Sequence, residues 1–343
     1  MKQRLKPSTD SANDLRREAL SAWIAERLPG EAFTLAPASA DASFRRYFRV
    51  TLDGVTRIAM DAPPEREDSR LFIHVAQLMR DAGVHVPEVL AADTAQGFML
   101  LTDLGNTTYL KALTDDNADA LFRDAIAALI TWQRASRPDV LPPYDRALLQ
   151  REMDLFPDWY VGRHLGLTLS DAQREVLAKI NQLLADSALA QPPVYVHRDY
   201  MPRNLMLSTP NPGVLDFQDA VYGPITYDVA SLFRDAYLSW PEERVIDWVA
   251  RYWEQAKRAQ LPVDPDFGAF YRALEWMGLQ RHLKVLGIFA RIHYRDGKPG
   301  YLEDTPRFLR YAREVGARYA ALKPLLHLLD ELEQRSPQVG YTF

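Results

Sequence analysis

An α+β chain of two lobes is the fold class that this sequence predicts, and three observations support it. Short strand-like runs separated by turn residues fill most of the first hundred positions. Beyond them, apolar residues recur with helical spacing along most of the chain. One stretch, from Val194 to Ala220, returns to strand-like runs. We therefore expect a small antiparallel-sheet N-lobe with one inserted helix over residues 1–103, and a larger, mostly helical C-lobe over residues 104–343.

The composition bounds what the chain can do. Its 343 residues and 47% hydrophobic content suit two lobes that each bury a core. The net charge of −5, with lysines and arginines scattered along the chain, argues against a nucleic-acid-binding surface. The absence of cysteine excludes both a disulfide framework and a thiolate metal site.

The sequence also bears on location and partners. The first twenty residues contain no apolar run of signal-peptide length, and no uncharged stretch approaches the roughly 20 residues of a membrane span. We therefore expect a cytoplasmic protein. We expect no membrane or nucleic-acid partner, and we expect a monomer.

The N-lobe pattern predicts a short series of elements. Asp53-Gly54 joins two strand-like runs, and both residues tolerate positive φ, which is a strong hairpin signal. A first helix carries Leu15, Ala19, Trp23 and Ile24 on one stripe. The predicted elements are a helix over Leu15–Leu28, strands over Phe33–Pro37, Phe44–Leu52 and Val55–Ala62, a helix over Ser69–Ala82 ended by Gly83, and strands over Glu88–Asp93 and Gly97–Thr102.

The C-lobe pattern is helical apart from the stretch named above. Amphipathic spacing predicts helices over about 115–135, 145–165, 170–188, 226–239, 241–260, 266–293 and 304–334.

The polar residues of the stretch "VYVHRDYMPRNLMLSTPNPGVLDFQDA" have the spacing of a catalytic site. Asp199 and Asn204 are five residues apart, and Asp216 follows twelve residues later at the end of a second apolar run. Oxygen ligands of this kind suit Mg²⁺, and phosphoryl transfer also needs a carboxylate to accept the proton of the acceptor hydroxyl. The order and spacing match the "HRD…N…DF" pattern of a protein-kinase-like catalytic site, and hence a protein-kinase-like bilobal fold. The plainer alternative is that these acids only cap turns.

Two features favour a small-molecule kinase over a protein kinase. Met201 stands where protein kinases carry a lysine, two residues after the catalytic aspartate. Asp216 is followed within a dozen residues by Tyr227-Asp228 and a helix, with no APE motif, so the chain has no room for an activation segment.

The strand expected to contact ATP lacks the lysine that kinases usually carry there. The third strand reads Arg57-Ile58-Ala59-Met60-Asp61, with Met60 about where a lysine usually contacts the ATP phosphates, and the next helix offers no acid before Asp81. The candidate replacements are Arg45, Arg46 and Arg49 on the preceding strand. Alternation places Arg46 on one face with Phe44, Phe48 and Val50, and places Arg45 and Arg49 on the other face with Tyr47.

Backbone groups are further candidates for the nucleotide. The turn over residues 39–43, including Ser43, is a candidate cradle of amides for phosphate. The connector Leu101–Gly105, including Thr102 and Leu104, would line a nucleotide cleft.

Three polar residues have structural interpretations. We expect His197 to hydrogen-bond backbone and hold its loop in shape, and Arg198 to pair with a local carboxylate. Asp228 lies at a helix start, where it either caps the helix or bonds to the catalytic loop. Asp219 is placed for a role at the metal or beside it.

Several blocks carry a family resemblance: "SFRRYFRV", "MDAPP", "HRDYMPRNLM" and "GVLDFQDAVYGPITYDVASLFRDAY". Over most of its length the chain resembles the aminoglycoside phosphotransferase (choline-kinase-like) superfamily. Within it, these blocks resemble the anomeric N-acetylmuramate/N-acetylglucosamine kinases of bacterial cell-wall recycling. The resemblance implies ATP as donor, Mg²⁺, and phosphorylation of the C1 hydroxyl of these sugars. It also implies Asp199 as the base, and Asn204 and Asp216 as metal ligands.

The acceptor site is the least determined part. N-acetylmuramate carries a lactyl carboxylate, which an arginine or histidine would bind. Arg234, Arg281-His282 and Arg163-His164 are candidates, and their spacing selects none of them. Two other functions stay open: a kinase of another hydroxyl, on an amino sugar, choline or an aminoglycoside, and a nucleotide-binding regulator without catalysis, which the missing lysine would allow.

Overall fold

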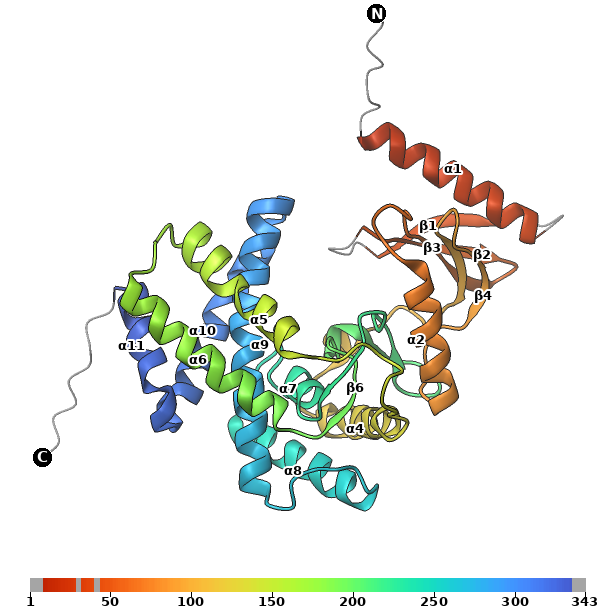
Figure 1. Cartoon of the computed structure of the whole chain (residues 1–343). Helices are drawn as coiled ribbons and strands as arrows, with labels where there is room; N and C mark the ends of the chain where they lie inside the picture. The colour runs from red at the N-terminus through yellow and green to blue at the C-terminus, as the bar shows by residue number, and fades with distance from the viewer. Residues whose placement is uncertain (1–8, 29–31, 40–43, 335–343) are drawn as a thin grey trace, which may run out of the picture. The chain divides into compact units, whose positions relative to one another are not determined.

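The protein is described from a computed structural model that covers residues 9–28, 32–39 and 44–334. The chain forms two compact units. The sheet unit contains Met1–Thr107 and Met206–Asp219, and the helical unit contains Thr108–Leu205 and Ala220–Phe343. The sheet unit thus takes in a second segment, 206–219, that the sequence assigned to the larger lobe. Figure 1 shows the elements along the chain.

The sheet unit is built around five antiparallel strands in the order β1-β2-β3-β5-β4. Asp53 (φ 47°) and Gly54 (φ 80°) join β2 to β3, which confirms the predicted hairpin. The elements of this unit are α1 (Thr9–Arg27), β1 (Thr34–Ser39), β2 (Arg46–Leu52), β3 (Val55–Asp61), α2 (Ser69–Ala82), β4 (Val89–Asp93), β5 (Phe98–Thr102) and β8 (Gly213–Val214), with β7 (Leu205–Met206) pairing β8.

Helix α2 has the predicted bounds because both of its ends are capped. The side chain of Asp68 accepts a hydrogen bond from the amide of Arg70 at the N-terminus. Gly83 ends the helix at φ 90°, a left-handed conformation that glycine adopts without steric cost.

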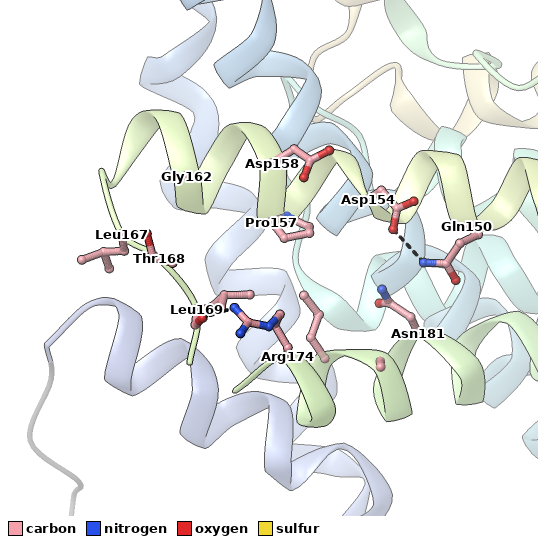
Figure 2. A pocket seen from close by; sticks show the side chains of 12 residues that line it. Gln150, Asp154, Pro157, Asp158, Gly162, Leu167, Thr168, Leu169, Arg174 and Asn181 are labelled. Atoms are coloured by element: carbon pink, nitrogen blue, oxygen red, sulfur yellow. Dashed lines mark hydrogen bonds between the residues drawn. The ribbon is translucent and has the colours of Figure 1, made fainter. Parts of the chain in front are cut away.

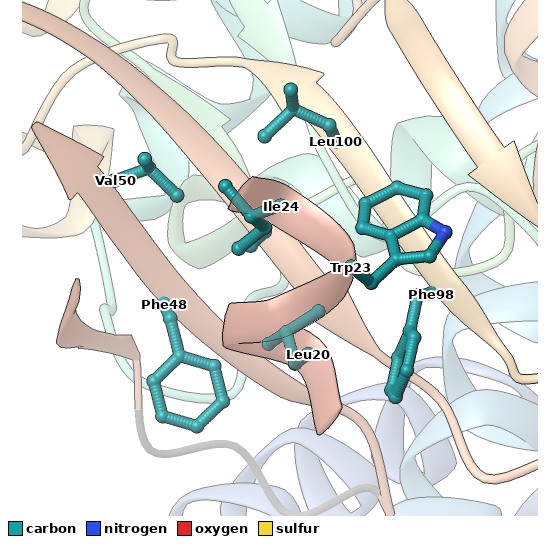
Figure 3. Close-up of a cluster of buried hydrophobic side chains, with 8 residues drawn as sticks. Leu20, Trp23, Ile24, Phe48, Val50, Phe98 and Leu100 are labelled. Atoms are coloured by element: carbon teal, nitrogen blue, oxygen red, sulfur yellow. The ribbon is translucent and has the colours of Figure 1, made fainter. Parts of the chain in front are cut away.

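Helix α1 packs on one face of the sheet. Leu20, Trp23 and Ile24 are buried against side chains of β2, β3 and β5 (Figure 3). These sheet residues are Phe48, Val50, Ala59, Phe98 and Leu100. The predicted stripe was partly wrong: Leu15 is 61% exposed and Ala19 is also exposed. The stripe fails there because burial under the sheet begins only at Leu20.

The same face holds a buried charge. Asp61 is fully buried, and it accepts hydrogen bonds from Arg16 of α1 and from Arg46 of β2, each at 2.9 Å from Nε. Arg46 and Asp61 are direct partners in the β2–β3 register. Arg46 therefore lies on the α1-covered face, as alternation predicted, where it ties the sheet to the helix.

The helical unit contains the remaining elements. They are α3 (Tyr109–Ala112), α4 (Ala118–Arg134), α5 (Arg146–Met153), the π-helix η1 (Phe156–His164), α6 (Asp171–Leu189), β6 (Pro193–Val196), the 3₁₀ turn η2 (Pro202–Asn204), β9 (Val221–Pro224), α7 (Tyr227–Phe233), α8 (Glu242–Arg258), α9 (Phe267–Asp296), η3 (Pro299–Asp304), α10 (Thr305–Arg318), η4 (Ala320–Leu322) and α11 (Lys323–Leu332).

One predicted helix is shorter than expected, and two are divided. The helix predicted over 226–239 ends at Phe233, because the Asp235 side chain accepts from the amides of Tyr237 and Leu238 and turns the chain. The helix predicted over 304–334 is broken at Tyr319, whose extended backbone ends α10, and a new helix, α11, starts at Lys323 with Pro324 in its first turn. The helix predicted over 145–165 is divided into α5 and η1.

Helix α9 forms the centre of this unit. It packs against η1, α6, α7 and α10, and it can be followed in Figure 1. Its buried face carries polar side chains among the apolar ones, including Gln280, Arg281, His282 and Lys284. Burying such groups requires partners, and those of Gln280 and Lys284 include Tyr144, Glu152 and Tyr227.

We predict that Asp61→Asn lowers the free energy of unfolding by about 2–4 kcal/mol, because two guanidinium groups lose their buried partner. Urea unfolding measures the change. Asp53→Asn is the matched control, since Asp53 is exposed and asparagine tolerates its positive φ. Equal stability of the two variants would contradict the role of Asp61.

Candidate functional site

The loop after β6 is anchored by one buried carboxylate. β6 pairs with β9 and leads directly into His197 and Arg198. Asp228, fully buried in the first turn of α7, accepts the backbone amide of His197 at 2.7 Å and that of Arg198 at 3.0 Å. Arg198 has φ 76°, a conformation that costs a non-glycine residue free energy. The two bonds from Asp228 offset that cost and fix the start of the loop.

The loop then closes around Asp199. The imidazole Nδ1 of the fully buried His197 accepts from the Asp199 amide at 3.2 Å. Asn204 donates from its side-chain nitrogen to the Asp199 carbonyl at 2.9 Å. The backbone of Asp199 is therefore held at both its amide and its carbonyl. Because the nitrogen of the Asn204 amide donates within the loop, its oxygen is the atom suited to a cation.

A second buried carboxylate holds the Arg198 side chain. Glu152 of α5 forms ion pairs with Arg198 at 2.5 Å and with Lys284 of α9 at 2.8 Å. Lys284 also donates to the phenol of Tyr227 at 3.0 Å, and Tyr144 hydrogen-bonds Glu152. Burial alone would raise the pKa of Glu152, but the two cations lower it to about 2. Glu152 is therefore charged at neutral pH.

The expected structural roles are confirmed for three residues of this region. His197 bonds backbone, Arg198 pairs with a carboxylate, and Asp228 bonds the loop rather than capping its helix. Burial raises the pKa of Asp228 to about 7, against the two amide bonds that lower it.

In the sheet unit, Asp216 follows β8 in a left-handed conformation with φ 63°. Its Oδ1 accepts from the side-chain nitrogen of Gln218 at 2.9 Å. The next residue, Phe217, is fully buried and packs against Phe72 of α2 with ring centroids 4.8 Å apart and the rings tilted by 38°. The phenylalanine thus anchors the position from which the carboxylate projects.

Arg45 lies beside two carboxylates of the sheet unit. Its guanidinium is 3.8 Å from Asp216 and 3.8 Å from Glu67, and its side chain is only 9% exposed. Burial would lower the pKa of Arg45, but the neighbouring phenol and carboxylates outweigh it and raise the pKa above the ordinary value. Met60 is fully buried on β3. An arginine–glutamate pair is thus present in the unit that lacks the strand lysine.

The other candidates for the nucleotide lie elsewhere in this unit. Arg49 forms two hydrogen bonds to Asp103, at 2.6 and 3.1 Å, and so ties β2 to the connector. Thr102 accepts the amide of Glu88 at 2.8 Å through its hydroxyl. Thr102 and Leu104 line a hollow of about 520 Å³ together with His85 and residues 208–210. Ser43 lies outside the described residues.

The two predicted metal ligands lie in different units. Asn204 of the helical unit offers an amide oxygen, and Asp216 of the sheet unit offers a carboxylate. Each is an oxygen ligand of the kind that Mg²⁺ prefers. Among residues 9–28, 32–39 and 44–334, no three acidic or histidine side chains gather as a metal site.

The three predicted sugar contacts lie inside the helical unit. Arg234 is 8% exposed and lies near Glu242 at 3.4 Å, and Arg281 is 2% exposed beside the sulfur of Met201. His282 is 1% exposed and stacks on Tyr311, and burial lowers its pKa to about 3. Little of their surface is available to a sugar. Arg163 is exposed, and His164 contacts the phenol of Tyr294 at 3.3 Å.

A further hollow of about 540 Å³ lies between α6 and the α5–η1 segment (Figure 2). Asp154, Asp158 and Asn181 line it, and none of its lining residues is a predicted site residue.

Sequence reasoning missed several residues that surround the predicted ones. Glu67 precedes α2 rather than lying within it, Glu152 and Lys284 are distant in sequence, and Arg203 lies inside the quoted "HRDYMPRNLM" block. Of these residues, only Arg203 could have been recognised from the sequence, because it directly precedes Asn204.

Comparison with known proteins gives consistent matches. The model of the phosphotransferase enzyme family matches residues 34–271. The N-acetylmuramate/N-acetylglucosamine kinase of Pseudomonas putida is 55% identical over 331 residues, covering 94% of this chain and 98% of that protein. The protein of that name from Neisseria meningitidis is 50% identical, covering 96% and 99%.

Solved structures share the fold at low identity. The choline kinase of Streptococcus pneumoniae aligns with a TM-score of 0.62 at 13% identity, covering 88% of this chain and all of that one. An ADP-bound aminoglycoside phosphotransferase, APH(2'')-Ib, aligns with a TM-score of 0.56 at 14% identity, covering 87% and 98%. The predicted protein-kinase-like α+β fold is thereby confirmed. No helix in the described part of the chain has the length and apolar character of a membrane span.

We predict that Glu152→Gln lowers the free energy of unfolding by about 3–5 kcal/mol near neutral pH, because Lys284 and Arg198 lose their buried counter-charge. The folded pKa of Glu152, about 2, lies below its unfolded value of 4.5, so its stabilisation is present above pH 4.5 and is lost as the pH falls toward 2. The difference between variant and wild type should therefore shrink below pH 4.5. Urea unfolding from pH 7 to pH 3 measures it.

Glu175→Gln is the control for this series, because Glu175 forms only an exposed pair with Lys179. A difference for Glu152→Gln that stays constant from pH 7 to pH 3 would contradict the assignment.

Proposed function

This chain belongs to the phosphotransferase enzyme family, and we propose that it is an ATP-dependent kinase of the anomeric C1 hydroxyl of N-acetylmuramate and N-acetylglucosamine. The substrates rest on the relatives that carry those names at 50–55% identity over nearly the whole chain. The chemistry rests on one observation, the loop in which Asp199 is held at its amide and its carbonyl.

Asp199 is the general base in this proposal. It accepts the proton of the C1 hydroxyl while that oxygen bonds to the γ-phosphorus and the bond from phosphorus to the bridging oxygen breaks, which releases ADP. An anomeric hydroxyl is more acidic than the other sugar hydroxyls and depends less on the base. The positioning of the hydroxyl, the base and the phosphate therefore accounts for most of the rate acceleration. Holding the Asp199 backbone with His197 and Asn204 supplies that positioning.

Asn204 and Asp216 are the proposed ligands of Mg²⁺. When bound, Mg²⁺ supplies positive charge that neutralises the phosphate oxygens. In the chain itself, Asp228 keeps the Asn204 loop in shape and Gln218 orients the Asp216 carboxylate. Ser43, Thr102 and Leu104 remain proposed nucleotide contacts.

Arg45 is the proposed cation for the ATP phosphates. It lies between Asp216 and Glu67, so it carries both the charge of the missing strand lysine and a glutamate partner. Arg46 and Arg49 are engaged with Asp61 and Asp103. This pair supports a catalytic function over the non-catalytic alternative, which the missing lysine had suggested.

The test is product analysis. Wild-type protein with ATP, Mg²⁺ and either sugar should release ADP and give a sugar phosphate whose phosphorus couples to the anomeric proton. Asp199→Asn should lower kcat roughly 10²–10⁴-fold while ATP still binds. Coupling to the C6 protons instead would overturn the assignment of C1, and near-normal turnover of Asp199→Asn would overturn the base.

We further predict that Arg45→Met lowers kcat/KM for ATP roughly 10- to 100-fold, the value of one or two charge-assisted hydrogen bonds. Arg46→Met is the matched control, a neighbouring arginine on the opposite face of the strand. It should lower stability and leave the KM for ATP unchanged. Steady-state kinetics with varied ATP separates the two, and the reverse pattern would exclude Arg45.

A further inference from the structure

Arg203 shares one tight turn with Asp199. The amide of Met201 donates to the Asp199 carbonyl at 3.0 Å, and the amide of Asn204 donates to the Met201 carbonyl at 2.8 Å. Arg203 lies within the 3₁₀ turn Pro202–Asn204, which the second of these bonds closes. Arg203 therefore lies in the same short, hydrogen-bonded loop as Asp199.

Two tyrosines hold the Arg203 side chain. Its Nη1 donates to the Tyr237 phenol at 2.9 Å, and it also hydrogen-bonds Tyr301. Its guanidinium carbon lies 5.5 Å from the centre of the Tyr237 ring. Phe289 of α9 packs against both rings, with centroids 6.5 Å from Tyr237 and 5.3 Å from Tyr301. The turn after α7, the η3 segment and α9 thus converge on one half-buried arginine.

This cluster presents hydrogen-bond donors. A phenol oxygen that accepts a hydrogen bond from a guanidinium keeps its own O–H as a donor. Burial, the largest effect, raises the pKa of Tyr237, so that its phenol is protonated at neutral pH. Arg203 also keeps its charge, because the tyrosines raise its pKa against the effect of burial. One cation and two hydroxyl donors suit a planar anion such as a carboxylate.

The two proposed sugars differ in one such anion. N-acetylmuramate carries a lactyl carboxylate on O3, and N-acetylglucosamine has a hydroxyl there. The other arginines close to this loop are engaged or enclosed: Arg198 pairs with Glu152, and Arg281 is 2% exposed. We propose that Arg203, with Tyr237 and Tyr301, binds the lactyl carboxylate and sets the preference between the two sugars. This inference rests on the proposed function.

The test compares substrates as well as variants. Arg203→Met should lower kcat/KM for N-acetylmuramate about 10- to 100-fold, the range of a charge-assisted hydrogen bond, and should change N-acetylglucosamine turnover little. Wild-type enzyme should lose a similar factor with the carboxamide of N-acetylmuramate, whereas Arg203→Met should not distinguish acid from carboxamide. Arg203→Lys should recover part of the loss, since it keeps the charge and loses the bidentate geometry.

Arg310→Met is the control, because Arg310 is a half-exposed arginine of α10 that contacts Ser239 at 3.0 Å. It should not change the ratio of the two sugars. N-acetylglucosamine turnover also reports that Arg203→Met is folded.

Three results would overturn the proposal. An equal loss for both sugars would assign Arg203 to the phosphates or to the loop, and an unchanged N-acetylmuramate rate would exclude Arg203 altogether. Failure of the wild-type enzyme to phosphorylate either sugar would instead refute the proposed function, and the carboxylate site with it.

Discussion

The buried carboxylate of Asp228 is the constraint on which the helical-unit site depends. It accepts two successive backbone amides, and one of them belongs to a residue with positive φ. Without this partner the two amides would be buried without acceptors. Asp228 fixes the start of the loop that carries Asp199, Arg203 and Asn204, so the proposed chemistry of these three residues depends on a fully buried side chain.

The charged side chains of this protein fall into two groups: those that stabilise the fold and those that are candidates for binding a ligand. Asp61 and Glu152 are buried acids that each hold two cations within one unit. Arg45 and Arg203 have different surroundings: Arg45 lies beside two carboxylates, and Arg203 lies beside two phenols. The phenol O–H groups beside Arg203 can donate to the same anion as its guanidinium.

Much of the fold was predictable, because local signals determine it. The Asp53-Gly54 hairpin, the bounds of α2 and the loop motif all follow from short-range chemistry. The distribution of arginine roles was not predictable, because it depends on residues far apart in the chain. Arg46 is distinguished from Arg45 by α1, and Tyr237 reaches Arg203 only because a helix ends early at Phe233. No pattern within a single segment carries that information.

The measurement that tests the central claim most directly uses a substrate blocked at C1. The methyl glycoside of N-acetylglucosamine keeps the other groups of the sugar, and it lacks the hydroxyl to which Asp199 is assigned. The account predicts that it competes with the free sugar and releases no ADP above background. Phosphorylation of the glycoside at a rate near that of the free sugar would show that another hydroxyl is the acceptor, and would contradict the account.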